Sequence, residues 1–171
     1  MLTIDDVSIR ALRLSDSDVL FRAINNPDLV RFNAPFDPIH EQNHLKWLEE
    51  TIKNQHKRFF IIEFENRSVG SVQLVDINFT HRNSEATIRL FNEDDCGKQV
   101  GTKAIKILCD YAFRDLGLVR VWLRVFADNV RAIRAYEKIG FVKEGIMNKA
   151  AFINGYFLDV IIMGKLNNDY F

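Results

Sequence analysis

Residues 96–141 have the sequence CGKQVGTKAIKILCDYAFRDLGLVRVWLRVFADNVRAIRAYEKIGF, in which helical and strand patterns alternate. The apolar residues of 100–116 recur at helical spacing, whereas 119–127 is a continuous apolar run typical of a buried strand. A second helix is predicted at 128–139, and a glycine follows each helix as a stop signal. Because another strand begins at Phe141, this order predicts a locally parallel crossover of right-handed sense.

The rest of the chain predicts mostly antiparallel pairing. Apolar stretches separated by short polar turns follow one another as in a meander, and an Asn-Gly pair near the C-terminus marks a hairpin. The fold class is therefore α/β in the mixed α+β sense, with about seven strands in one twisted sheet and about four helices. No repeat or linker divides residues 1–171, so one domain is expected. The expected elements are a strand at 7–13, a helix from Ser15 to about Asn25 ended by Asn26-Pro27, a loop at 33–38, a helix at 39–55, strands at 58–64, 69–79 and 84–91, and a hairpin at 150–165.

The charge balance limits the classes of partner. Lys+Arg and Asp+Glu both number 23, which argues against a dominant nucleic-acid or anionic-membrane surface. No apolar run is long enough to span a bilayer, and the first residues, MLTIDDVSIR, place acids where a signal peptide is basic. A cytoplasmic location is therefore expected.

Cysteine and histidine spacing predicts neither a disulfide framework nor a metal site. Cys96 and Cys109 have no zinc-type spacing, and Cys109 is expected in the core of a helix. A single histidine pair four residues apart on a helix is a poor metal site. The histidines are therefore predicted at the surface, and no metal is expected; they are His40, His44, His56 and His81.

The junction before the helix at 100–116 is a candidate phosphate site. Gly97 and Gly101 allow the backbone to approach a ligand closely, and the start of a helix favours an anion. Lys98 and Lys103 add positive charge, so a pyrophosphate is the natural occupant. A plain capped helix start is the alternative.

A second candidate group lies on the helix at 128–139. Tyr136 follows Asn129 by seven residues and lies two turns along the same face. A tyrosine at the crevice between two parallel strands can protonate a leaving thiolate. The alternative is a core aromatic residue with its hydroxyl at the surface.

These segments together resemble a known family. GKQVGTKAIKILCDYAF and LRVFADNVRAIRAYEKIGFVKEG resemble the acetyl-coenzyme A signature of the GNAT N-acetyltransferase superfamily. IRALR, LVDIN-x-x-HR and AFING are similar to spermidine N-acetyltransferases, in a neighbourhood that includes ribosomal-protein N-terminal acetyltransferases. The resemblance covers nearly the whole chain. It implies the GNAT fold with a parallel strand pair forming the cofactor crevice, acetyl-CoA as donor and a homo-oligomer.

The resemblance also implies roles for individual residues. Tyr136 matches the general acid, Glu85 matches a glutamate that can act as base, and backbone N–H groups at Arg89 and Leu90 would hold the thioester carbonyl. The phosphate loop departs from the family pattern, because Cys96 and Gln99 replace an Arg or Gln and a glycine. The residues implied for acetyl-CoA are Arg89, Leu90, Gly97, Lys98, Gln99, Val100, Gly101, Thr102, Asn129, Arg131 and Tyr136.

The acceptor amine is the least determined part of the hypothesis. A polyamine such as spermidine is the first choice, although Asn33-Ala34-Pro35 replaces the acidic pair that spermidine enzymes carry before a proline. An amino-sugar nucleotide and a protein N-terminus are alternatives, and a GNAT-fold binding module with impaired cofactor binding is the alternative from another class. The candidate substrate residues are Phe36, Asp37, Glu41, Trp47 and Asp76.

Overall fold

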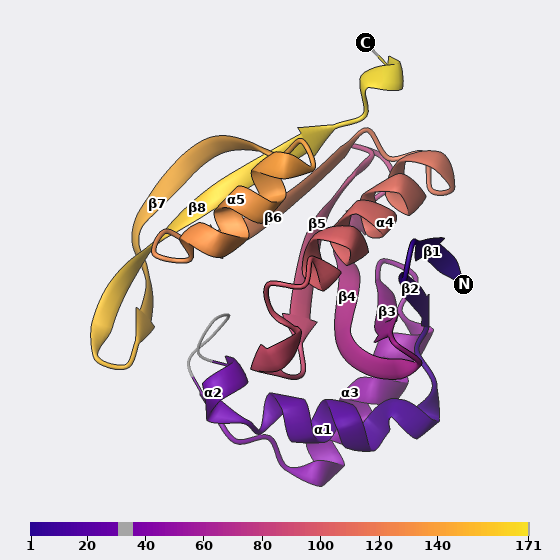
Figure 1. The fold of residues 1–171 in the computed structure, drawn as a ribbon, viewed down its shortest axis with the longest axis vertical. Helices are drawn as coiled ribbons and strands as arrows, with labels where there is room; N and C mark the ends of the chain where they lie inside the picture. The colour runs from indigo at the N-terminus through magenta and orange to yellow at the C-terminus, as the bar shows by residue number, and fades with distance from the viewer. Residues whose placement is uncertain (31–35, 171) are drawn as a thin grey trace.

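The computed structural model describes residues 1–30 and 36–170, and an eight-stranded sheet forms the centre of this part (Figure 1). Only β5 and β6 pair in parallel, and the other neighbouring strands are antiparallel. The expected mixed, mostly antiparallel sheet is confirmed. In spatial order the strands are β1 (Leu2–Ile4), β2 (Val7–Ala11), β3 (Arg58–Phe64), β4 (Arg67–Asn78), β5 (Asn83–Leu90), β6 (Arg120–Phe126), β8 (Tyr156–Leu166) and β7 (Val142–Ile153).

Helices lie on both faces of this sheet. The α-helices are α1 (Ser17–Ile24), α2 (Pro27–Val30), α3 (Glu41–Lys53), α4 (Val100–Arg114) and α5 (Val130–Lys138); the 3-10 turns are η1 (Leu14–Asp16), η2 (Glu93–Asp95) and η3 (Asn168–Tyr170). The large core cluster joins α4 to the sheet, and a smaller cluster joins Leu20 and Leu48, from α1 and α3, to Ile61. Ile62 belongs to the large cluster, so adjacent β3 residues face opposite layers, as strand alternation requires.

The crossover segment follows the prediction. Ile105, Leu108 and Ala112 of α4 are fully buried, each contributing apolar burial against the sheet. The chain then passes through β6 and α5 to β7, and β8 inserts between β6 and β7. The hairpin turn at Asn154-Gly155 is also confirmed, since both residues have positive φ between β7 and β8.

Three local features were not predicted. Strand β1 was not predicted because three residues carry too little periodicity. The first predicted helix ends before Asn26-Pro27 as expected, since α1 ends at Ile24, but Pro27 then begins the further short helix α2, where its missing N–H has no helical partner to lose. On α3 the buried face is formed by His44, Leu48 and Thr51, while the apolar Leu45 and Ile52 are about half exposed.

The surface placement of His44 is therefore wrong. Its Nε2 lies 3.0 Å from the Ser17 carbonyl oxygen, and its ring stacks on Trp47 at 5.5 Å. Cys109 is buried on α4 as expected, and burial raises the pKa of its thiol to about 12. None of the described helices is long and apolar enough to cross a membrane.

Candidate active site

The parallel strands β5 and β6 separate part-way along their length. They pair only where Asn83–Glu85 lies beside Arg120–Trp122. Beyond that point β5 continues to Leu90 and β6 to Phe126 without pairing to each other. Figure 1 shows the two strands diverging toward the end of the sheet that carries α1 and α2. The divergence leaves backbone polar groups of β5 without a strand partner.

The direction of these groups follows from strand alternation. The Phe91 N–H, just beyond β5, donates to a β4 carbonyl at 2.9 Å. Because N–H groups of alternate residues point to opposite edges of a strand, the Arg89 N–H also faces β4. The N–H groups of Leu90 and Ile88 therefore face the gap beside β6. Of the two expected thioester donors, Leu90 is the one directed into the gap, and Ile88 is a further donor that was not predicted.

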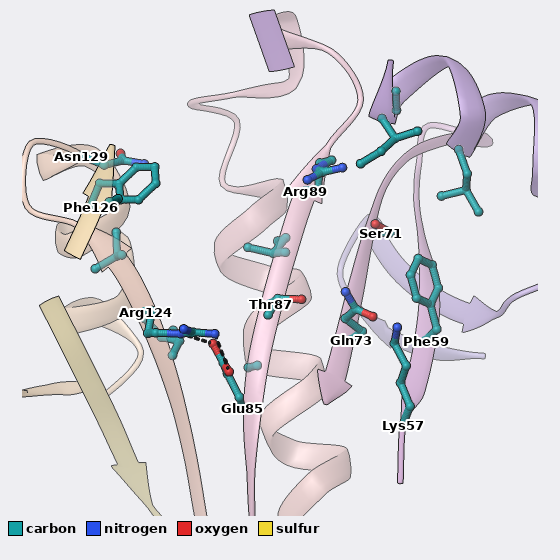
Figure 2. Close-up of a pocket in the computed structure, with 18 of the residues that line it drawn as sticks. Lys57, Phe59, Ser71, Gln73, Glu85, Thr87, Arg89, Arg124, Phe126 and Asn129 are labelled. Atoms are coloured by element: carbon teal, nitrogen blue, oxygen red, sulfur yellow. Dashed lines mark hydrogen bonds and ion pairs between the residues drawn. The ribbon is translucent and has the colours of Figure 1, made fainter. Parts of the chain in front are cut away.

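A cavity of about 710 Å³ occupies this gap and extends between the sheet and helices α1 and α3. Figure 2 shows Glu85, Thr87 and Arg89 spaced along β5 at its wall. Five candidate residues line it: Trp47, Glu85, Arg89, Asn129 and Tyr136. The lining also includes Lys57, which directly precedes β3, and Ser71, Gln73 and Arg124 on β4 and β6; these four were not predicted.

Glu85 and Arg124 bridge the diverging strands. Arg124 Nε donates to Glu85 Oε1 at 2.8 Å, and a second guanidinium nitrogen donates to Oε2 at 3.1 Å (Figure 2). The Glu85 carboxylate is buried, whereas about half of the Arg124 side chain is exposed. Hydrogen bonding to Glu85 raises the pKa of Arg124. Both carboxylate oxygens are engaged, so a proton transferred to Glu85 would arrive at a carboxylate already bound by a cation.

Tyr136 reaches the cavity from α5. Its ring lies 6.0 Å from that of Phe141, and burial raises the pKa of its hydroxyl to about 12. The phenol is therefore protonated at neutral pH and available as a proton donor. Asn129 begins the same helix, where its side-chain oxygen accepts the Ala132 N–H at 3.2 Å and caps α5. Arg131 is exposed beside a second hollow, next to the β7–β8 hairpin.

The loop before α4 has the backbone of a glycine loop although it lacks one glycine. Gly97 has φ +85°, and Gln99, the N-cap of α4, has φ +62° and ψ 5°. The Lys103 N–H is bonded to the Gln99 carbonyl at 2.9 Å, so the N–H groups of Val100, Gly101 and Thr102 precede the first helical hydrogen bond. These donors are suited to an anion at the helix start.

The lysines of this loop have carboxylate neighbours. Lys103 lies 3.2 Å from Asp5 and 2.6 Å from Asp6, between β1 and β2, which directs its charge away from the loop. Lys98 Nζ lies 3.7 Å from the buried Asp95. The hydrogen bond from Arg67 holds the pKa of Asp95 below its usual value. The backbone therefore contributes more to this anion site than the two lysines do.

The candidate substrate residues are not gathered in one place. Trp47 lines the cavity, but Phe36, Asp37, Glu41 and Asp76 are exposed and are not part of its lining. Glu41 lies in the exposed first turn of α3, and Asp76 lies at a bulge of β4 with φ +51°. Asn33-Ala34-Pro35 lies outside the described residues. Among those that are described, no group of three His, Cys, Asp or Glu side chains is arranged to hold a metal ion.

The cavity-lining residues that were not predicted from the sequence share a weak signal. Gln73 lies between apolar residues in SVQLV, and Arg124 lies between them in WLRVF. An isolated polar residue in an apolar strand can face either solvent or a cavity. Only the order of the strands distinguishes a solvent-facing side chain from a cavity-facing one, because that order decides which elements cover each face of the sheet.

Known proteins share this architecture. The family described as "Acetyltransferase (GNAT) domain" matches residues 6–142. The chain is 32% identical over 166 residues to the spermidine N(1)-acetyltransferase of Escherichia coli K12, which covers 96% of this chain and 88% of that protein. For the Vibrio cholerae spermidine N(1)-acetyltransferase the identity is 31% over 166 residues, covering 96% and 95%.

The fold of this chain also agrees closely with that of a solved relative. The crystal structure of spermidine N-acetyltransferase from Vibrio cholerae in complex with CoA and spermine matches with a TM-score of 0.89 at 29% identity, covering 96% of this chain and 98% of that one. The fold and family expectations are confirmed, and this chain belongs to the GNAT acetyltransferase family.

Proposed function

We propose that this protein transfers the acetyl group of acetyl-CoA directly to a primary amine of a small molecule. The observation that carries the proposal is the divergence of β5 from β6, because strand alternation directs the Leu90 N–H into the gap between them and Tyr136 lines the cavity in that gap. Membership of the GNAT family supports acetyl transfer, and the Vibrio cholerae relative was solved with CoA.

The residues present fit acetyl-CoA. The first turn of α4 offers backbone donors for the pyrophosphate, and a Cβ at Gly97 would meet nothing within 4 Å, so the loop has room for a ligand. We assign the phosphates to residues 97–102 and the thioester end to the gap beside Leu90. We assign contacts with the intervening arm to Asn129 and Arg131 at the start of α5.

Direct transfer requires three contributions from the chain. The ammonium must lose a proton, and Glu85 is the proposed acceptor, directly or through water. The Leu90 N–H would stabilise the negative charge that develops on the carbonyl oxygen when the nitrogen attacks. As the new C–N bond forms and the C–S bond breaks, Tyr136 would give its proton to the departing thiolate. No covalent intermediate on the enzyme is needed.

A polyamine such as spermidine is the first proposed acceptor, because the relatives named above are spermidine N-acetyltransferases. An amino-sugar nucleotide and a protein N-terminus are the alternatives. Among these alternatives, the charge of the cavity favours acceptors that carry an anion. Lys57 and Arg89 line the cavity, and neither is hydrogen-bonded to a carboxylate in the described chain.

Two measurements test the proposal. Acetyl-CoA at 100 times its Kd should stabilise the fold by about 2.7 kcal/mol, which a thermal-shift titration detects. Thiol release should then depend on an added amine, with spermidine, an amino-sugar nucleotide and an N-terminal peptide as the first panel. A protein that acetyl-CoA does not stabilise would be a GNAT-fold binding module, and acetyl transfer would be refuted.

We also propose a homo-oligomer in the cytoplasm. The β7–β8 hairpin extends away from the rest of the sheet (Figure 1), and Phe152, Tyr156 and Phe157 on it are each more than half exposed. Exposed aromatic residues of this kind suit a subunit contact. Cys96 and Cys109 are both free thiols, which suits a reducing compartment.

A further inference from the structure

The charged groups of the cavity are unequal in sign. Its lining holds three cations, Lys57, Arg89 and Arg124, and one carboxylate, Glu85. Because Arg124 binds both oxygens of Glu85, these two charges largely offset each other. Lys57 has Asp76, outside the lining, as an electrostatic neighbour. Arg89 remains without a nearby carboxylate among the described residues, so the surplus of positive charge at the cavity wall lies there. Such a surplus attracts anions.

Arg89 is the more specific of the two cations. Within residues 1–30 and 36–170, its guanidinium has no hydrogen-bond or ion-pair partner, whereas Arg10, Arg67 and Arg124 each bind a carboxylate. Burial lowers the pKa of Arg89, yet a guanidinium remains charged at neutral pH. A half-buried, unpaired cation lowers the stability of the fold unless a ligand supplies its counter-charge.

A serine hydroxyl lies on the strand beside Arg89. Arg89 lies directly opposite Ser71 in the β4–β5 ladder, and Figure 2 shows both side chains at the cavity wall. A serine hydroxyl can add a neutral donor beside the guanidinium fork, which binds carboxylates and phosphates in a bidentate manner. Lys57 is held near the rings of Trp47 and Phe59, at 5.4 Å and 5.8 Å from their centroids.

A second unsatisfied group lies on the same face. Gln73 Oε1 is buried and has no hydrogen-bond partner among the described residues. Gln73 pairs with Thr87, and Ser71 with Arg89, so the two pairs are neighbours on one face of the sheet. An acceptor oxygen without a donor suits the N–H groups of an amine. Two residues along a strand span about 7 Å, which sets the scale between this acceptor and Arg89.

We propose that the cavity accepts amines that also carry a carboxylate or a phosphate, in addition to the polyamines of its relatives. The anion binds Arg89 and Ser71, and the amine end lies toward Gln73 and Glu85. This inference rests on the proposed acetyl transfer and names a further acceptor class for it. The short distance between Gln73 and Arg89 requires an acceptor whose amine and anion are only a few bonds apart. Small amino acids and amino-sugar phosphates meet this requirement.

The test compares acceptors that differ only in the anion. Thiol release is measured for an amino acid against its carboxamide, for an amino-sugar phosphate against the free amino sugar, and for spermidine. We expect kcat/KM to be about 10- to 100-fold higher for the anionic member of at least one pair, the range of one charge-assisted hydrogen-bonded contact. The pair that shows the preference identifies carboxylate or phosphate as the anion.

Variants connect the preference to Arg89. In Arg89→Leu and Arg89→Gln, the KM of the anionic member should rise toward that of the neutral member, so that the preference is lost. Arg114→Leu, at the exposed end of α4, is the matched control and should keep the preference. The melting temperature of Arg89→Leu should not fall, because no protein partner is lost.

Three results would overturn the inference: equal rates within both pairs, a preference that survives in both Arg89 variants, or spermidine as the only amine acetylated. Absence of thiol release with every amine, spermidine included, would instead refute the proposed acetyl transfer.

Discussion

Replacing Gln99 by glycine should stabilise the protein without changing its affinity for acetyl-CoA. Gln99 has φ +62° and ψ 5°, and its side chain makes no capping hydrogen bond to α4, so the substitution removes no contact of that kind. A residue with a Cβ loses about 1–2 kcal/mol in this left-handed region. Glycine also makes the unfolded chain more flexible, which lowers the free energy of unfolding by about 0.4–1 kcal/mol and offsets part of this gain. The net gain is about 0.5–1 kcal/mol.

The gain corresponds to a rise of about 1–4 °C in Tm for a chain of 171 residues. Differential scanning calorimetry measures it, and titration calorimetry measures the Kd for acetyl-CoA. The Kd should stay the same because the loop already has the glycine-type backbone. Gln99→Ala is the control: it removes the same side chain but keeps the Cβ, so its Tm should remain near that of the wild type. If alanine and glycine raise the Tm equally, the side chain rather than the backbone is responsible, and the reasoning fails.

Three further changes test other parts of the structure. Tyr136→Phe should lower kcat by roughly 100- to 10,000-fold with little change in the KM for acetyl-CoA. Because burial raises the pKa of Tyr136 to about 12, ionisation of the tyrosine should not lower the wild-type rate up to about pH 10. An unchanged kcat in the variant would show that Tyr136 is not the proton donor. Gly70→Ala would bring a Cβ to 2.6 Å from the Arg89 carbonyl oxygen, so denaturant unfolding should show a loss of about 1–3 kcal/mol; wild-type stability would show that the strand can shift. Asp95→Asn should lower stability at pH 7 but not in strong acid. Arg67 holds the pKa of Asp95 below its unfolded value of about 4, so the stabilisation by this carboxylate is lost as the pH falls through the folded pKa. A stability difference that does not depend on pH would contradict this prediction.

Local sequence patterns were sufficient to predict those helices and strands whose own periodicity is strong. The helix expected at 100–116 is α4, Val100–Arg114, and the strand expected at 119–127 is β6, Arg120–Phe126. Both elements bury a continuous apolar surface, so their periodicity is strong. On α3 the pattern was ambiguous, and the buried face proved to include His44, because a carbonyl of the neighbouring α1 satisfies its ring nitrogen.

The candidate site divides in the same way. Gly97 and Tyr136 were found from sequence because the residues around each form a short, recognisable local motif. Lys57, Gln73 and Arg124 were missed, since they come from or adjoin three strands that meet only through the register of the sheet.

By itself, the sequence determined most of the elements, the parallel crossover and the family, because periodicity and motif spacing are properties of contiguous residues. Only the tertiary structure decided where β5 leaves β6, which polar side chains share the cavity, and that Arg89 faces it without a carboxylate partner among the described residues. The physical reason is that a side chain's charge is known from its identity, whereas its partner is set by which strands lie beside it.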